Sequence, residues 1–268
     1  MKKYLDKYYY CFFMGFQNAL EYRVDFLFSL ISCIFPIIIQ VSLWSAIYKA
    51  TGTGVVYGYS YKQMIMYTLL VGLVGKFLST GFEWEINEDI KMGGLSKYIV
   101  RPLNYIYYRL SCFLGGRISL SIVVIFFITI IMMVFPNEER VTVLRIIGIM
   151  MSFILAMLLN FFIYFILGIS AFYFTEASKI FPAVSIIFTV ISGGIFPLDI
   201  LGEGYMKLLN ILPFKYMLQF PVDVLIGKVS NGDVLCGISI QLVWAVLIFI
   251  FLKLLFNKGL KKYVAIGG

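Results

Sequence analysis

Histidine is absent from the 268-residue sequence, and charged side chains make up only 13% of it. Soluble domains carry about 25% charged residues. Without histidine, most zinc and haem sites and the usual imidazole general base are excluded. The four cysteines are scattered and form no C-x-x-C pair, which argues against a metal site or a disulfide framework.

Apolar side chains are abundant instead: they make up 61% of the residues, and the mean hydropathy is +0.94. A soluble domain has about 45–50% apolar residues and could not bury this excess. The net charge of +8 comes without a basic run of the kind that binds nucleic acid. These properties predict a protein whose main solvent is lipid and that has no nucleic-acid partner.

The apolar runs predict an all-α integral membrane protein with six transmembrane helices. The expected spans cover 26–48, 61–80, 110–135, 146–172, 180–196 and 236–256. Residues 1–25 precede them with an aromatic-rich face, which predicts an amphipathic helix lying in the membrane interface. The alternative is that these residues simply begin a long first span. With both termini in the cytoplasm, more lysines and arginines fall on the inner connections than on the outer ones, as the positive-inside bias requires.

Two connections have unusual composition. Residues 81–103 contain Glu83, Glu85, Glu88, Asp89 and Lys91, and Gly93-Gly94 then ends the helix. A short charged helix suits docking into a cleft of a soluble partner, although a solvated loop gives the same pattern.

Residues 197–235, on the outer side, are apolar yet interrupted by Pro197, Pro213 and Pro221. A segment too broken to span and too apolar for water predicts a re-entrant helical segment before the last span. An ordinary interfacial loop is the alternative.

In this order, the parts resemble the permease subunit of a bacterial ABC transporter of the type 2 export class. Residues 90–103 read IKMGGLSKYIVRPL and are similar to a G-x-L-x-x-Y-L-x-R-P pattern in that class. Residues 193–228 resemble its FP…LP…P-x-x-Y segment through Phe196-Pro197, Leu212-Pro213 and Tyr216.

The resemblance implies a single transmembrane domain, not itself an enzyme, in the plasma membrane of a bacterium. Two permease copies, identical or sister chains, would form the pathway, and two separate ATPase subunits would bind ATP and magnesium. This chain would bind no cofactor. The expected substrate is an amphipathic peptide, lipid-like compound or drug. Consistently, Gly75-Lys76 and Gly227-Lys228 lack the other residues of a phosphate-binding loop.

Candidate site residues follow from these expectations. ATPase coupling is assigned to the five charged residues of 83–91 named above, with a second contact at Thr175 and Glu176. Arg117, Lys76 and Asn160 are pathway candidates because polar groups inside spans are costly, although snorkelling or helix packing also explains them. The spans contain no inward His, Asp or Glu cluster, which disfavours an intramembrane enzyme. A secondary transporter, or a membrane assembly protein without an ATPase partner, remains the alternative.

Overall fold

The computed structural model describes residues 2–21, 23–101, 103–135 and 143–263. Pro102 of the resemblance motif and the expected turn at 136–140 lie outside these residues. The helices are α1 (Lys2–Glu21), α2 (Arg23–Thr51), α3 (Tyr61–Leu78), α4 (Phe82–Lys91), α5 (Ser96–Ile99), α6 (Tyr105–Val134), α7 (Val143–Ile169), α8 (Phe181–Ile191), α9 (Glu203–Ile211), α10 (Gln219–Ile226) and α11 (Asn231–Leu260), with the 3₁₀ turns η1 (Ser170–Phe172), η2 (Ala177–Ile180), η3 (Leu198–Leu201) and η4 (Lys215–Met217). A two-residue strand pair, β1 (Val55–Val56) and β2 (Tyr59–Ser60), joins α2 to α3.

Five helical stretches are long and apolar enough to cross a membrane. They are Leu30–Thr51, Tyr61–Lys91, Tyr105–Val134, Arg145–Phe172 and Asn231–Leu260. The protein is therefore a multi-pass, all-α membrane protein, apart from its one small hairpin. A capping box fixes the start of α3: the Ser60 hydroxyl accepts a hydrogen bond from the Gln63 backbone amide at 3.3 Å, and the Gln63 side-chain oxygen accepts one from the Ser60 backbone amide at 2.9 Å.

The expected span 180–196 is represented by a short helix. α8 has 11 residues, and at 1.5 Å per residue it reaches about 17 Å, against a hydrocarbon core about 30 Å thick. Helix α8 ends at Ser192, and Gly193 follows with φ of +85°. Among the described residues, the structure thus has five long apolar helices and one short one.

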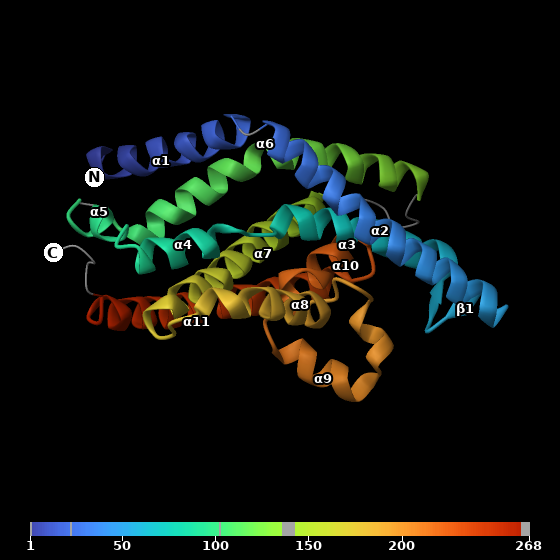
Figure 1. The fold of residues 1–268 in the computed structure, drawn as a ribbon. Helices are drawn as coiled ribbons and strands as arrows, with labels where there is room; N and C mark the ends of the chain where they lie inside the picture. Colours follow the sequence, from blue (N-terminus) through green and yellow to red (C-terminus); the bar gives the residue numbers. More distant parts are fainter. Residues whose placement is uncertain (1, 22, 102, 136–142, 264–268) are drawn as a thin grey trace.

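Helix α7 lies at the centre of the bundle, between α11 on one side and α3 and α4 on the other (Figure 1). Leu159, Phe161 and Phe165 are fully buried there. Gly168 lets α4 approach, because a Cβ at this position would lie 2.9 Å from Ile86 and 3.1 Å from the Glu83 carbonyl. The close packing of α4 on α7 thus depends on Gly168 of α7 and Ile86 of α4.

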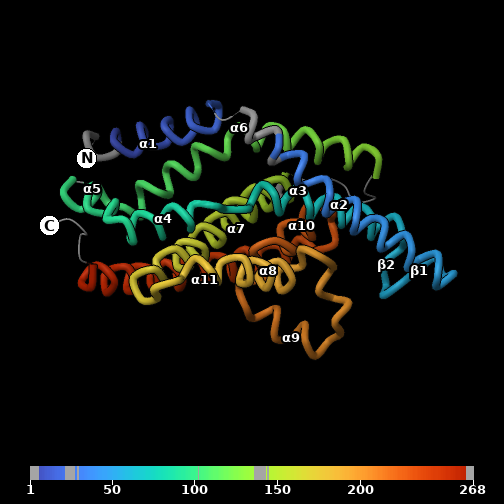
Figure 2. Tube along the Cα trace, viewed as in Figure 1, coloured from blue at the N-terminus to red at the C-terminus, as the bar shows by residue number. Residues whose placement is uncertain are grey.

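The two ends of the bundle differ. Helices α4 and α5 and the end of α11 lie at one end, and the hairpin lies at the other (Figure 2). We call the first the inner end and the second the outer end. Residues 197–235 form short pieces, with Pro197 before η3 and Pro213 after α9, whereas Pro221 lies in the first turn of α10. Helix α9 projects from the bundle (Figure 1), and α10 is almost wholly buried.

Helix α1 packs lengthwise against the first half of α6, parallel to it. The packed face carries small residues: the Cys112 thiol donates to the Cys11 carbonyl at 3.3 Å, and Gly15 and Gly115 each lie directly against the backbone of the other helix. The aromatic-rich face expected to contact the interface is partly exposed, as at Tyr9 and Leu20. The helix expected within residues 1–25 is present, and protein covers its small-residue side.

We predict that Gly115→Ala destabilises the protein, whereas Gly116→Ala is tolerated. A Cβ on Gly115 would collide with the Phe12 carbonyl, which is backbone and cannot turn aside, while a Cβ on Gly116 would lie 3.6 Å from the Gly15 carbonyl, an ordinary contact. Overpacking of this kind costs roughly 1–3 kcal/mol. Thermal unfolding of the detergent-solubilised variants measures the difference, and equal melting temperatures would contradict the close contact between α1 and α6.

Candidate functional site

The acidic residues of α4 do not form one exposed face. Glu83 is 5% exposed, whereas Glu88 is exposed at the surface. Glu85 and Asp89 both pair with Arg109 of α6. Glu85 and Glu88 therefore remain exposed, whereas Glu83 is buried and Asp89 is mostly covered; the role of these residues in ATPase coupling stays a prediction.

Arg109 of α6 uses all three nitrogens of its guanidinium group, and two of them bind carboxylates of α4. Its Nη2 donates to Asp89 Oδ2 at 2.5 Å and its Nε donates to the Tyr105 hydroxyl at 3.0 Å, while Nη1 contacts the Glu85 carboxylate. Tyr105 in turn donates to Asp89 Oδ2 at 2.6 Å. The Arg109 side chain is only 10% exposed, so removing both carboxylates would leave a buried charge without compensation. Sequence reasoning placed Arg109 only as an inner positive charge and missed this contact.

The two connections expected to meet a partner lie side by side at the inner end. The Lys91 ammonium donates to the Phe174 carbonyl at 2.9 Å, and the Trp84 and Phe181 rings are 5.0 Å apart. Thr175 and Glu176 are exposed next to this junction. We define the inner-end surface as the exposed residues of 84–101 and 174–180.

A cavity of about 360 Å³ lies among α2, α3, α7 and α8, and we call it the central cavity. It brings together two of the three pathway candidates, Lys76 and Asn160. The Asn160 amide donates to the carbonyls of Ala156 and Met217, at 2.9 and 3.1 Å, and so ties α7 to η4. Arg117 does not line this cavity: its guanidinium contacts the Ser79 carbonyl and lies 5.0 Å from the centroid of the Phe113 ring.

The residues singled out in the broken segment have structural partners. Phe196 packs against the buried cluster of Trp44, Tyr48 and Met64, and Pro197 precedes η3. Tyr216 is buried, and its hydroxyl donates to the Asn210 carbonyl at 2.9 Å across the turn that contains Pro213.

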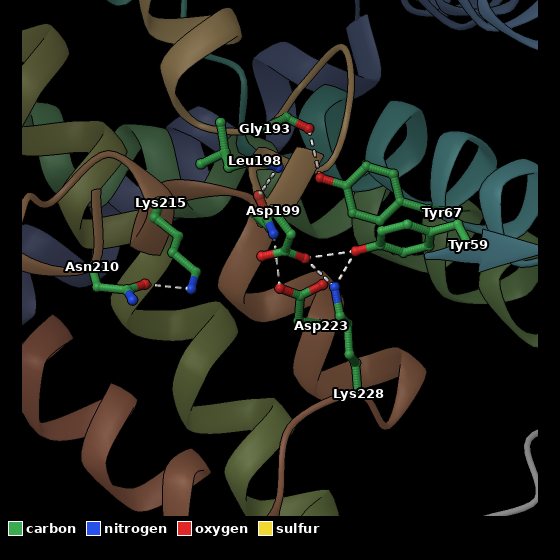
Figure 3. A network of polar contacts seen from close by, with 10 residues as sticks. Tyr59, Tyr67, Gly193, Leu198, Asp199, Asn210, Lys215, Asp223 and Lys228 are labelled. Carbon is green, nitrogen blue, oxygen red and sulfur yellow. Dashed lines mark hydrogen bonds and ion pairs between the residues drawn. The ribbon is translucent and has the colours of Figure 1, made fainter. Parts of the chain in front are cut away.

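At the outer end, side chains from three separate segments form a polar network (Figure 3). The Tyr59 hydroxyl of β2 donates to Asp199 Oδ2 at 2.6 Å, and the Lys228 ammonium, just after α10, contacts both residues. Gln219 of α10 connects the Leu198 amide, at 2.9 Å, to Asp223, at 3.1 Å. We call these residues the outer polar network; sequence reasoning did not identify it.

The two carboxyl groups of the network have opposite pKa shifts. Burial raises the pKa of Asp223 to about 6, the charge of Asp199 adds to this, and Lys228 opposes it. Burial also acts to raise the pKa of Asp199, but hydrogen bonds from Lys228 and Tyr59 outweigh it and hold that pKa below its ordinary value. The Asp223 Oδ1 atom is buried and has no hydrogen-bond partner among the described residues.

The fold and these sites define a class: a helical, multi-pass membrane protein whose inner connections form one surface and whose helices enclose a partly polar cavity. No group of three or more potential metal ligands occurs among the described residues. The family model described as ABC-2 family transporter protein matches residues 24–267. The chain therefore belongs to the ABC-2 family and is a transporter membrane component. No individual curated protein matches the sequence.

We predict that Asp223→Asn stabilises the protein at pH 8 and does so by only about half as much at pH 5, which lies between the ordinary pKa of 3.8 and the folded-state pKa of about 6. Because the folded-state pKa of about 6 exceeds the ordinary 3.8, the contribution of this carboxyl to stability is complete below pH 4 and is lost as the pH rises through 6. A shift of about two pKa units corresponds to roughly 3 kcal/mol.

The melting temperature of the variant relative to the wild type, measured at both pH values, checks this prediction. Asp233→Asn, in the exposed first turn of α11, serves as the control for exchanging a carboxyl for an amide. A stabilisation by Asp223→Asn that is the same at pH 5 and pH 8 would show that Asp223 is not the group that titrates.

Proposed function

We propose that this chain is the permease subunit of an ATP-driven exporter, in which two copies, identical or sister chains, form the pathway. Two separate ATPase subunits bind the inner-end surface and supply the ATP and magnesium chemistry. The inner end, with both termini, faces the cytoplasm of a bacterium. In this arrangement α8 is a short fifth pass, and 197–235 enters the membrane again from the outer side. The substrate is an amphipathic peptide, lipid-like compound or drug.

The observation that carries the proposal is the junction of the two inner connections. Lys91 of α4 is bonded to the Phe174 carbonyl next to Thr175 and Glu176, so a partner that moves one connection also moves the other. A permease without its own phosphate-binding loop needs such a surface for its ATPase.

The inner-end surface has an apolar tip with charges around it. Met92, Ile99 and Val100 are 76%, 55% and 82% exposed, and Lys97 and Arg101 are exposed beside them. An apolar centre with a charged rim is the usual composition of a protein interface. The contact with the ATPase is therefore centred on these residues, with Glu85 and Glu88 at its edge and Asp89 behind it.

Motion of the inner-end surface has two routes into the membrane helices. One passes from Glu85 and Asp89 through Arg109 to α6. The other passes from Ile86 to α7 at Gly168, where the two helices are in close contact. The energy for the change comes from the higher affinity of nucleotide-closed ATPases for one permease state.

The central cavity supports a transport pathway between two copies. Its lining includes Gln40, Tyr164 and Thr189, and such polar groups are tolerated at membrane depth when they face protein or a water-filled space. A secondary transporter, the alternative function, typically uses buried carboxylates for ion coupling; of the described residues that line this cavity, none is acidic. A membrane assembly protein would bind no ATPase.

We predict that Val100→Glu removes the ATPase from the purified complex. A buried charge at the centre of an interface costs more than 2 kcal/mol, which lowers affinity more than about tenfold. The tagged chain is purified from the cells that naturally produce it, and co-purifying ATPase is quantified by mass spectrometry. Val55→Glu is the matched control, since Val55 is 58% exposed but lies at the outer end.

Retention of the ATPase by Val100→Glu at the wild-type amount would show that the docking surface lies elsewhere. If the wild-type chain itself carries no ATPase, the exporter proposal is wrong and the alternative of an ATPase-independent transporter or assembly protein is favoured.

A further inference from the structure

Lys76 stands out in the central cavity because of its charge. Of the described residues that line the cavity, Lys76 is the only charged one. It makes no ion pair or side-chain hydrogen bond with the described residues, in contrast to Arg109, Lys179 and Lys228, which all have carboxylate partners. An ammonium group in a low-dielectric cavity needs a counter-charge.

The surroundings of Lys76 increase this need. The positive charge of Arg117 acts on Lys76, and the charge of Glu83 acts on Arg117. Lys76 lies in the last turn of α3, two residues before the helix ends at Leu78. The inner end of the cavity thus carries an excess of positive charge.

The rest of the lining is mostly apolar, with a few hydrogen-bonding groups. Pro36, Ile37, Val71, Phe188 and Leu218 form apolar walls. Asn160 is 8% exposed, and both of the hydrogen bonds it donates go to backbone carbonyls. Its Oδ1 accepts none from the described residues, so it is an acceptor open to a ligand.

We propose, on the basis of the transport function above, that the central cavity binds an anionic amphiphile, with its acidic group on Lys76 and its apolar chain between α2 and α8. The shared chemistry is a phosphate, sulfate or carboxylate head on a hydrocarbon tail. A volume of about 360 Å³ lies at the lower end of the range for ligand sites, which suits a single chain. Such a molecule reaches the cavity either as a transported solute or as a resident anionic lipid.

The cavity contains its own reporter, since Cys33 also lines it. The chain alone, in phosphatidylcholine nanodiscs, is treated with N-ethylmaleimide in the presence of dodecyl phosphate or dodecyltrimethylammonium. We expect dodecyl phosphate to slow alkylation of Cys33 several-fold and the cationic amphiphile to have little effect. Cys236 is exposed on α11 and does not line the cavity, so it serves as the internal control.

Variants of one helix test the role of the charge. Lys76→Gln should abolish the protection by dodecyl phosphate, and Lys76→Arg should retain it. Lys62→Gln is the matched control, because Lys62 lies in the first turn of the same helix, near the Phe135 ring. Equal protection by both amphiphiles, or protection that persists in a folded Lys76→Gln, would overturn the proposal.

A final experiment distinguishes a resident anionic lipid from a transported solute as the ligand. Nanodiscs that contain phosphatidylglycerol are tested without added amphiphile: protection of Cys33 there supports a resident lipid, and protection by dodecyl phosphate alone supports a solute. Because no ATPase is present, binding that succeeds while ATPase co-purification fails would retain this site and reject the exporter proposal.

Discussion

The contact of Arg109 with Glu85 and Asp89 determines what the inner end of this protein can present to a partner. A guanidinium group that is largely withdrawn from water needs carboxylates, and α4 supplies two of them. The same contact holds Asp89 largely out of solvent, while Glu85 stays exposed on the same surface as the apolar residues Met92 and Val100. The inner-end surface therefore carries fewer free carboxylates than the α4 sequence suggests, because two of them compensate one buried charge.

Local patterns in the sequence were sufficient to predict the helical membrane class and the positions of the long apolar helices, because a run of about 20 apolar residues has few other uses. The break at Gly93, whose φ is +78°, was also foreseeable. The residues that pair with the polar and small side chains could not be foreseen from the sequence. Arg109 pairs with acids 20 and 24 positions away, and nothing in the sequence around Gly115 indicates that it packs against Phe12.

For the segment 197–235, before α11, the sequence likewise predicted the local structure but not the contacts between distant residues. Its prolines correctly predicted short pieces instead of one helix, because proline removes a backbone donor and clashes with the preceding turn. The outer polar network was not foreseeable, since Tyr59 and Lys228 are separated by 169 positions. Once formed, the network joins the hairpin to the segment and holds Asp223 in a buried place, where its ionisation opposes folding. The position of that carboxyl was fixed by packing around α10, which composition alone does not reveal.

The cations at the two ends of the bundle have carboxylate partners, whereas the cation in its middle has none among the described residues. This difference affects how the bundle can rearrange. At the inner end Arg109 joins α4 to α6, and at the outer end Lys228 joins η3 to β2. Rearrangement of either end must separate charges that are already paired, so each end resists opening on its own. Lys76, between them, has no such partner within the described chain. A bound anion there would be neutralised in place without disturbing either pair, whereas release of that anion restores an uncompensated charge. The state of the cavity can thus bias the bundle through electrostatics alone, because a ligand shifts a conformational equilibrium only by its different affinity for the two states.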